Sequence, residues 1–217
     1  LYLDTNLTRE WLPIIWDVDL SQGHCYNGVE GYFDDDLITN ATFVGSSAVY
    51  AFFSSAPEIR QMVARRVRTL MDTLVQPPGT INGIFETRMR EIVVSVDPDP
   101  ANPSPWTDGD LDAARWGIDA RFIQNRPREE VERVIANYFA PRRAFLFNKG
   151  AGRPTYNGVY FPDAAQTNVP GMIVIDSLDF LPASGTQAHE YVIVRNTTGQ
   201  SVDISGWTLG GQISYTF

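Results

Sequence analysis

The sequence contains a single cysteine, Cys25, two histidines, His24 and His189, and a single lysine, Lys149, among 217 residues. One cysteine excludes an internal disulfide framework and a cysteine-based zinc site. The histidines are too far apart in the sequence for a zinc-binding motif. No apolar run reaches the length of a membrane-spanning helix, so we predict no transmembrane segment. A basic surplus is also missing, because the formal net charge is −9, and this argues against a nucleic-acid partner.

Neither end of the chain has the pattern of a natural terminus. The sequence starts at Leu1 without an initiator methionine or a signal peptide, and Leu1–Asp4 has the pattern of a strand interior. Phe217 also falls within an alternating pattern. We therefore expect the sequence to be part of a longer protein. Hydrophobic residues make up 43% of the chain, which is enough for a substantial core.

Two carboxylates follow the apolar run Leu12–Trp16, which we predict to be a buried strand in a hairpin with residues 1–3. Asp17 and Asp19 lie on one face of such a strand, because side chains alternate. Buried charge needs compensation, and a divalent cation bound by oxygen ligands is the usual solution. Asp17 and Asp19 are therefore candidate metal ligands. The alternative is a strand end whose carboxylates cap a turn or pair with arginine.

Three further groups near this strand are weaker candidates. Glu30 and the acidic run 34–36 are either additional metal ligands or a solvated face, and the run lacks the alternating spacing of a calcium loop. His24 and Cys25 are adjacent, so their side chains are poorly placed to form a nucleophilic dyad.

Helical periodicity dominates residues 54–146. Ser55, Pro57 and Glu58 predict a helix start with a capping box, and Pro77-Pro78-Gly79 predicts its end. Further helices are expected over about 81–94, from 107 to beyond Trp116, and from Pro127, with a kink or break at Pro141. We expect apolar stripes to face the core and the arginines of the first helix to face solvent, although one of them could reach an acidic partner. The predicted stripes are Ile59, Met62, Val63, Val67, Leu70, Met71 and Leu74; Ile81, Ile84, Phe85, Met89 and Ile92; and Val131, Val134, Ile135, Tyr138 and Phe139.

The pattern changes after Phe147. Residues 148–170 are rich in Gly, Pro, Asn and Thr and are expected to form an irregular linker. Residues 171–217 have the pattern of short strands with turns, and we expect one strand with alternating faces over 190–196 and another over 201–205. We expect Trp207 in a sandwich core, on one inner layer with Val192, Val194, Val202 and Ile204. A truncation at Trp207 would then destabilise the module by about 3–5 kcal/mol.

Residues Ile14–Gly23 contain the sequence Trp-Asp-Val-Asp-Leu-Ser-Gln-Gly, which resembles the W-D-x-D-x-x-x-G segment of the spore-coat protein H (CotH) kinase-like family. The resemblance continues in the family's order over about residues 1–147. It includes an arginine- and leucine-rich helix, a second helix with Glu-x-Arg, an Ala-Arg-Trp-Gly segment ending at Gly117, and a final helix with Tyr-Phe-Ala-Pro-Arg-Arg-Ala-Phe-Leu.

Two other segments resemble the signatures of bacterial lamin tail domains, which are immunoglobulin-like sandwiches. Glu190–Asn196 is similar to E-(W/F/Y)-V-E-L-x-N, with Ile193 in place of the usual second glutamate, and Val202–Leu209 is similar to V-D-L-S-G-W-x-L. The resemblances together imply an α+β chain. The helical C-lobe of an atypical kinase-like fold (1–147) would be followed by a linker (148–170) and a partial, lamin-tail-like all-β immunoglobulin-like sandwich (171–217).

The family resemblance implies ATP- and magnesium- or manganese-dependent phosphoryl transfer to hydroxyl groups of a protein substrate, with Asp17 and Asp19 at the metal. No catalytic residue is assigned within this sequence, because the family's phosphate loop and base lie upstream of the position of Leu1, and we expect the fragment alone to be inactive. The resemblance also implies an extracellular or cell-surface location. The alternative is a non-catalytic attachment module of a large bacterial surface protein, with a cell-surface partner.

Overall fold

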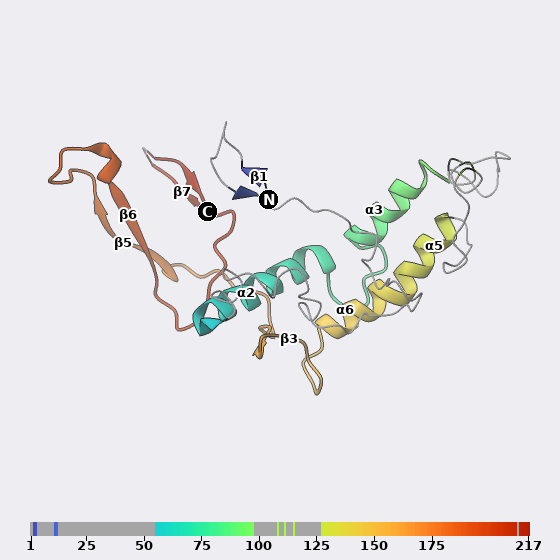
Figure 1. Cartoon of the computed structure of the whole chain (residues 1–217). Helices are drawn as coiled ribbons and strands as arrows, with labels where there is room; N and C mark the ends of the chain where they lie inside the picture. The colour runs from blue at the N-terminus through green and yellow to red at the C-terminus, as the bar shows by residue number, and fades with distance from the viewer. Residues whose placement is uncertain are drawn as a thin grey trace. The chain divides into compact units, whose positions relative to one another are not determined.

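The computed structural model describes residues 2–3, 11–12, 55–97, 108, 111, 115, 127–211 and 213–217 (Figure 1). These residues form both helices and small antiparallel sheets, so the α+β class is confirmed. None of the described helices is long and apolar enough to cross a membrane. The elements are β1 (Tyr2–Leu3), β2 (Trp11–Leu12), α2 (Pro57–Leu70), η1 (Met71–Val75), α3 (Ile84–Val93), α5 (Pro127–Val134), η2 (Ile135–Phe139), α6 (Ala140–Leu146), β3 (Thr155–Tyr156), β4 (Val159–Tyr160), β5 (Ile173–Asp179), η3 (Gln187–His189), β6 (Tyr191–Asn196), β7 (Thr208–Leu209) and β8 (Tyr215–Thr216).

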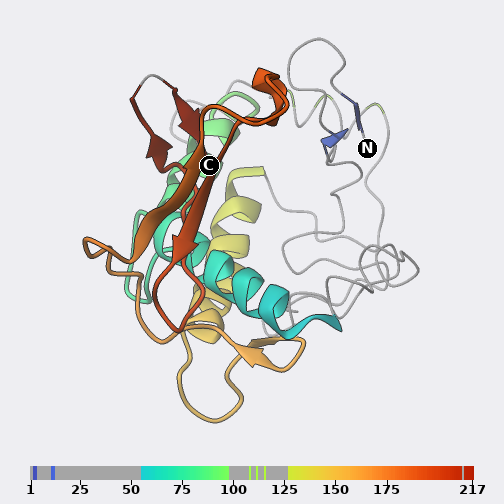
Figure 2. The same ribbon diagram turned by 90° about the vertical axis from the view of Figure 1, so that its left-hand side faces the viewer.

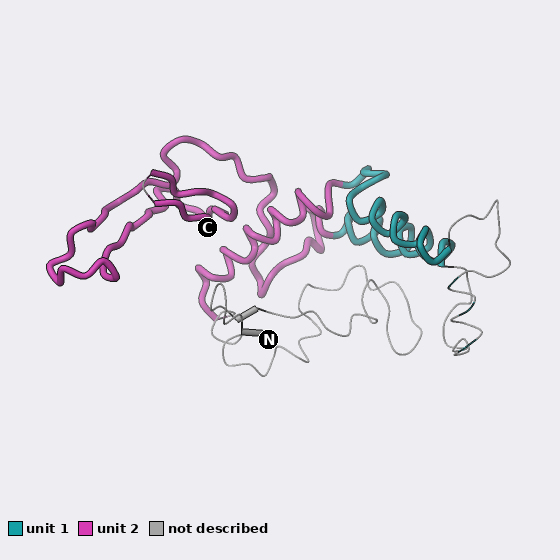
Figure 3. The backbone as a smooth tube through the Cα atoms, turned by 90° about the horizontal axis from the view of Figure 1, so that it is seen from above, with its two compact units in different colours: residues 1–35, 78–145 teal, residues 36–77, 146–217 magenta. Residues whose placement is uncertain are grey.

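Contacts divide the chain into two compact units (Figure 3). The first unit contains β1, β2, α3, α5, η2 and α6 as far as Phe145, and the second contains α2, η1, the end of α6 and β3 to β8. Helix α2 therefore groups with the C-terminal segments. These compact units do not test the expected domain boundaries at residues 147 and 170, which stay predictions.

The N-terminal hairpin is confirmed at its described positions. Tyr2 pairs with Leu12 and Leu3 with Trp11 in an antiparallel ladder. The second strand thus begins at Trp11, one residue before the predicted apolar run. Residues 13–16 lie outside the described part of the chain.

Helix α2 starts at Pro57, where the missing N–H of proline would have no helical partner anyway. The predicted capping box at Ser55 is wrong, because Ala56 is the N-cap and no side chain caps the helix. The helix continues through the π-helical turn η1 and ends before Gln76, which has a φ of +66°. The predicted end at the following proline pair is confirmed.

The predicted apolar stripe of α2 is confirmed only in part, because Met71 is buried and Ile59, Val63 and Val67 are half-buried. Ala64, Arg68 and Met71 are buried, whereas Met62 is 60% exposed. Leu70 and Leu74 are exposed as well. The predicted solvated face of arginines is therefore wrong for Arg68. Its aliphatic stem is buried while its guanidinium finds hydrogen-bond partners, which lets a charged residue replace an apolar one at a packed position.

Helix α3 is shorter than predicted and buries a different face. It begins after Gly83, so Ile81 precedes it and is 79% exposed. Ile84 and Ile92 are also exposed, and the buried residues are Glu86 and Val93. Phe85 is half-buried and stacks on Phe139 of η2 with ring centroids 5.3 Å apart. Helix α3 packs beside α5 (Figure 1).

The last helical segment runs without a break from Pro127 to Leu146 (Figure 1). Pro141 lies within α6, so of the predicted kink or break at this residue the break is wrong. The π-helical segment η2 ends two residues before it. Proline has no N–H to donate to the preceding turn, and the wider π-helical turn just before it accommodates this missing hydrogen bond. The predicted stripe from Val131 to Phe139 is half-buried. Asp108, Leu111 and Arg115 are helical, as expected for the short third helix, and Trp116 lies outside the described residues.

Residues 148–170 are not wholly irregular. Strands β3 and β4 form a hairpin whose two loop residues, Asn157 and Gly158, have φ values of +46° and +80°. Positive φ at both loop positions is typical of a type I′ turn, for which Asn-Gly is the preferred pair. Tyr156 and Phe161 are buried, and the hairpin contacts α2. The Asn-Gly pair predicts this hairpin, but the high Gly, Pro, Asn and Thr content around it favoured an irregular linker instead.

Strands β5 and β6 lie side by side in an antiparallel ladder with an irregularity at Ile175–Ser177 (Figure 2). The predicted alternation in β6 is confirmed, because Val192 and Val194 are half-buried while Tyr191 and Ile193 are exposed. Residues 201–205 were also expected to form a strand, and they do not.

Trp207 follows a bend at Gly206, whose φ of +77° favours glycine. The bend is fixed by hydrogen bonds, because the Gly206 N–H donates to the carbonyl of Phe217 and the Phe217 N–H donates to the carbonyl of Trp207. Trp207 is half-buried, as are Val202 and Ile204, so it is not the fully buried core residue that we expected. We accordingly expect its truncation to be less destabilising than for a residue in a closed core.

Candidate functional site

The predicted metal ligands Asp17 and Asp19 lie outside the residues that the structure describes, as do His24, Cys25, Glu30 and the acidic run 34–36. Their role as a metal site therefore stays a prediction. In the described part of the chain, no group of three or more His, Cys, Asp or Glu side chains is arranged to hold a metal ion.

The arginines of α2 make several polar contacts with other segments of the second unit. Arg68 donates from Nε and Nη2 to the two carboxylate oxygens of Asp72, at 3.0 and 2.9 Å. Its Nη1 donates to the carbonyls of Pro162 and Asp163, both at 3.2 Å. The guanidinium also lies 5.0 Å from the ring centroid of Phe147. One side chain thus joins the helix to the loop that follows β4.

Asp203 provides a second link to α2, through an ion pair with Arg66 at 3.2 Å. Burial acts to raise the pKa of Asp203. Hydrogen bonds from the Ser205 side chain and backbone, from Thr69 and from Arg66 outweigh it and lower the pKa from 3.8 to about 2. The backbone N–H of Asp203 donates to Oε1 of Gln166, and Nε2 of Gln166 donates back to the Asp203 carbonyl. These bonds hold residues 201–205 against α2 in place of the strand that we expected.

The low pKa of Asp203 should make the stability of the second unit depend on pH in acid. Because the folded-state pKa is lowered, the ionised carboxylate stabilises the fold above about pH 4, and this contribution is lost as the pH falls through about 2. In thermal melts followed by circular dichroism, the melting temperature should fall less between pH 4 and 2 in Asp203→Asn than in the wild type. Asp163→Asn, at an exposed position, is the control. Parallel pH profiles for Asp203→Asn and the wild type would contradict the assignment.

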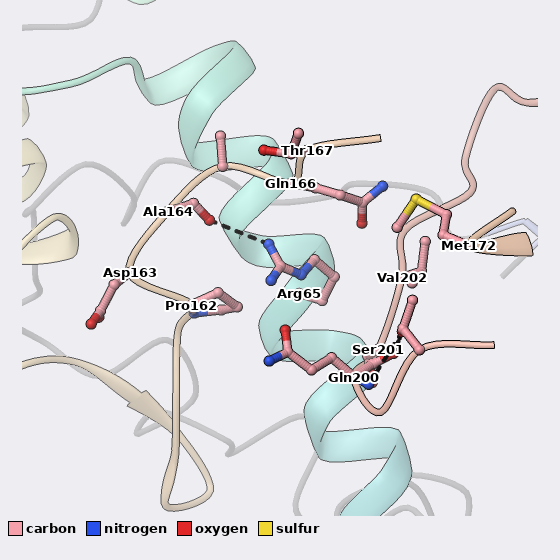
Figure 4. A pocket seen from close by; sticks show the side chains of 12 residues that line it. Arg65, Pro162, Asp163, Ala164, Gln166, Thr167, Met172, Gln200, Ser201 and Val202 are labelled. Atoms are coloured by element: carbon pink, nitrogen blue, oxygen red, sulfur yellow. Dashed lines mark hydrogen bonds between the residues drawn. The ribbon is translucent and has the colours of Figure 1, made fainter. Parts of the chain in front are cut away.

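A pocket of about 400 Å³ opens beside Arg65 (Figure 4). The Arg65 side chain extends from α2 between the loop at 162–167 and the segment at 200–202. Nη1 of Arg65 makes one long hydrogen bond, 3.4 Å, to the carbonyl of Ala164. Its Nε is buried and has no hydrogen-bond partner. Burial lowers the pKa of the Arg65 guanidinium and the charge of Arg68 lowers it further, while the charges of Asp72 and Asp203 oppose this shift in part. The pocket is lined by Arg65, Pro162, Asp163, Ala164, Ala165, Gln166, Thr167, Met172, Thr198, Gln200, Ser201 and Val202.

The first unit contains a buried ion pair. Nη2 of Arg143 donates to Oε1 of Glu86 at 2.6 Å, and the two side chains are 4% and 2% exposed. Nη1 of Arg143 donates to the carbonyl of Thr80 at 3.2 Å. The second carboxylate oxygen of Glu86 is buried without a hydrogen-bond partner. The pair therefore joins α6 to α3 and to the turn before it.

A second buried carboxylate, Asp97, lies just after α3 and is 1% exposed. Its Oδ2 accepts the backbone N–H of Arg128 at 3.3 Å, and its carbonyl accepts Nη2 of Arg128 at 2.6 Å. Arg128 is in the first turn of α5, where backbone N–H groups have no helical acceptor and a negative charge is favourable. Asp97 therefore stabilises the start of α5.

The prediction that an arginine of α2 reaches an acidic partner is confirmed for Arg66 and Arg68. Sequence reasoning missed the buried roles of Glu86, Arg143 and Asp97. For Arg68, the Arg-x-x-x-Asp spacing to Asp72 is a signal that could have been used. For Glu86, its position seven residues before Val93 on the same helix face is a weaker signal.

The comparisons with known proteins add no family assignment, because no protein-family model, no curated protein and no solved structure matches the chain.

Proposed function

We propose that this protein is part of a secreted or surface-exposed phosphotransferase of the CotH-like type, in which Asp17 and Asp19 hold Mg²⁺ or Mn²⁺ on the phosphates of ATP. The observation that carries the proposal is the buried Glu86–Arg143 ion pair. Glu86 belongs to the Glu-x-Arg segment and Arg143 to the Pro-Arg-Arg segment on which the resemblance depends. Because the two side chains form one buried ion pair, the two segments depend on each other for packing, which supports their belonging to one family pattern.

The donor chemistry of the Asp-x-Asp motif fits such an ion. Carboxylate oxygens are the ligands that hard divalent cations prefer. The described ladder of β1 and β2 leads the chain into the segment that contains both aspartates. When bound, the metal would neutralise negative charge on the phosphoryl group that is transferred to a protein hydroxyl. Asp17 and Asp19 would bind and orient the ion.

For the C-terminal part we propose a lamin-tail-like module. Val192 and Val194 of β6 and Leu209, Tyr215 and Phe217 at β7 and β8 line one apolar pocket of about 450 Å³. Two antiparallel ladders with apolar side chains toward a common space support the beginning of a sandwich. The bend at Gly206 supports the same proposal, because the signature places Gly-Trp there.

The metal site is tested by isothermal titration of the full-length protein with MgCl₂ and MnCl₂, with and without ATP. Asp17→Ala should abolish divalent binding, and Asp19→Ala should weaken it about tenfold or more, because each removes a charged ligand. Asp108→Ala, at an exposed helical position, is the matched control and should bind as the wild type does. A wild-type protein that binds neither ion in either condition would remove the basis of the proposal.

A second candidate function is non-catalytic attachment to a cell-surface partner. It is favoured by large apolar side chains on β5 and just after it, where Ile175, Leu178, Phe180 and Leu181 are 55–79% exposed. Large exposed apolar side chains close together in the sequence favour an interaction surface. The same titration separates the two functions, because an attachment module has no need to bind nucleotide or metal.

A further inference from the structure

The pocket beside Arg65 contains an imbalance of charge. Three arginines around it have carboxylate partners: Arg66 pairs with Asp203, Arg68 with Asp72, and Arg153 with Asp163. Arg65 contacts none of these carboxylates within hydrogen-bond distance, and its only protein partner among the described residues is the carbonyl of Ala164. A half-buried charge with one long hydrogen bond is unfavourable unless another group compensates it.

The rest of the lining is suited to hydroxyl groups. Among the described residues, the Gln200 amide and the hydroxyls of Thr167 and Ser201 have no hydrogen-bond partner, although all three line the pocket. An amide and two hydroxyls provide both donors and acceptors. Met172 and Val202 add apolar surface on one side. The volume lies within the range of about 300–1,000 Å³ that small-molecule sites occupy.

We propose that this pocket binds a small acidic saccharide, such as a uronic acid, with its carboxylate on the Arg65 guanidinium and its hydroxyls on Thr167, Gln200 and Ser201. A guanidinium and a carboxylate form a charge-assisted pair with matched geometry. A single unpaired positive charge matches a single negative charge. The site is independent of Asp17 and Asp19.

Isothermal titration of the full-length protein with sodium glucuronate tests the site, with glucose, sulfate and phosphate as comparison ligands. Glucuronate should bind about tenfold or more tightly than each of the three, and Arg65→Gln should lose about tenfold or more of that affinity. Gln200→Ala should lose less, because it removes a neutral partner. Arg88→Gln removes the same charge from an exposed ion pair in the other unit and should bind as the wild type does.

A second measurement keeps folding apart from binding. In backbone amide NMR spectra, glucuronate should shift the signals of residues 164–167 and 200–202 in the wild type. Arg65→Gln should melt at the same or a higher temperature than the wild type without ligand, because it removes a half-buried charge that has no carboxylate within hydrogen-bond distance. The proposal is overturned if glucuronate does not bind, if glucose or sulfate binds equally well, if a folded Arg65→Gln binds normally, or if the shifted signals lie elsewhere. Should Arg65→Gln fail to fold, unchanged binding by a Thr167→Ala/Gln200→Ala double variant overturns it as well.

Discussion

Replacing Arg143 by methionine should lower the free energy of unfolding by about 3–5 kcal/mol, because it leaves the Glu86 carboxylate buried without its charged partner. Only one oxygen of Glu86 is hydrogen-bonded even in the intact protein. The variant removes that bond as well as the bond to the Thr80 carbonyl. Urea unfolding followed by circular dichroism measures the loss.

The double variant Glu86→Leu/Arg143→Met provides the sharper comparison. It removes both charges and should recover most of the stability, because apolar side chains can replace a buried pair with little loss. Arg88→Ala is the surface control, since its pair with Glu91 is exposed on both sides, and it should change stability by less than about 1 kcal/mol. If Arg143→Met were no less stable than Arg88→Ala, the buried contact between α3 and α6 would not exist in solution.

Replacing Arg68 by glutamine should destabilise the second unit by about 2–4 kcal/mol, because several hydrogen bonds to a charged group are lost at once. The bidentate bond to Asp72 and the bonds to the carbonyls of Pro162 and Asp163 all depend on the guanidinium fork. Arg68→Lys should recover only part of the loss, because an ammonium group cannot reproduce that geometry.

Trypsin provides a local measurement of the same change. Lys149, which Gly150 follows, lies just before the hairpin of β3 and β4, whose following loop is held by Arg68. Cleavage after Lys149 should be faster in Arg68→Gln than in the wild type, because local opening exposes the backbone to the protease. Arg66→Gln, two residues away on the more exposed side of α2, should be cleaved at close to the wild-type rate. Equal cleavage rates for Arg68→Gln and Arg66→Gln would show that Arg68 does not anchor the loop.

Local chemistry was enough to predict several boundaries. Proline at position 57 and the proline pair at 77–78 mark the limits of the first helix, because proline fits a first turn and cannot continue a last one. Alternation in β6 and the bend at Gly206 follow from backbone geometry in the same way. Asn157-Gly158 carried an equally local signal for the β3–β4 hairpin. It was overlooked because the composition around it is that of a linker.

The sequence by itself thus determined the α+β class, the ends of the first helix and the alternation in the last long strand, since each depends on residues close together in the chain. Only the tertiary structure decided which helix faces are buried. Periodicity gives the angle between side chains but not the side that another segment will cover. Arg68 is buried because a loop more than 90 residues later supplies carbonyls to it, and Glu86 is buried because Arg143 reaches it from another helix. The unpartnered state of Arg65 arises in the same way, because the nearby carboxylates are bonded to other arginines that only the fold brings together.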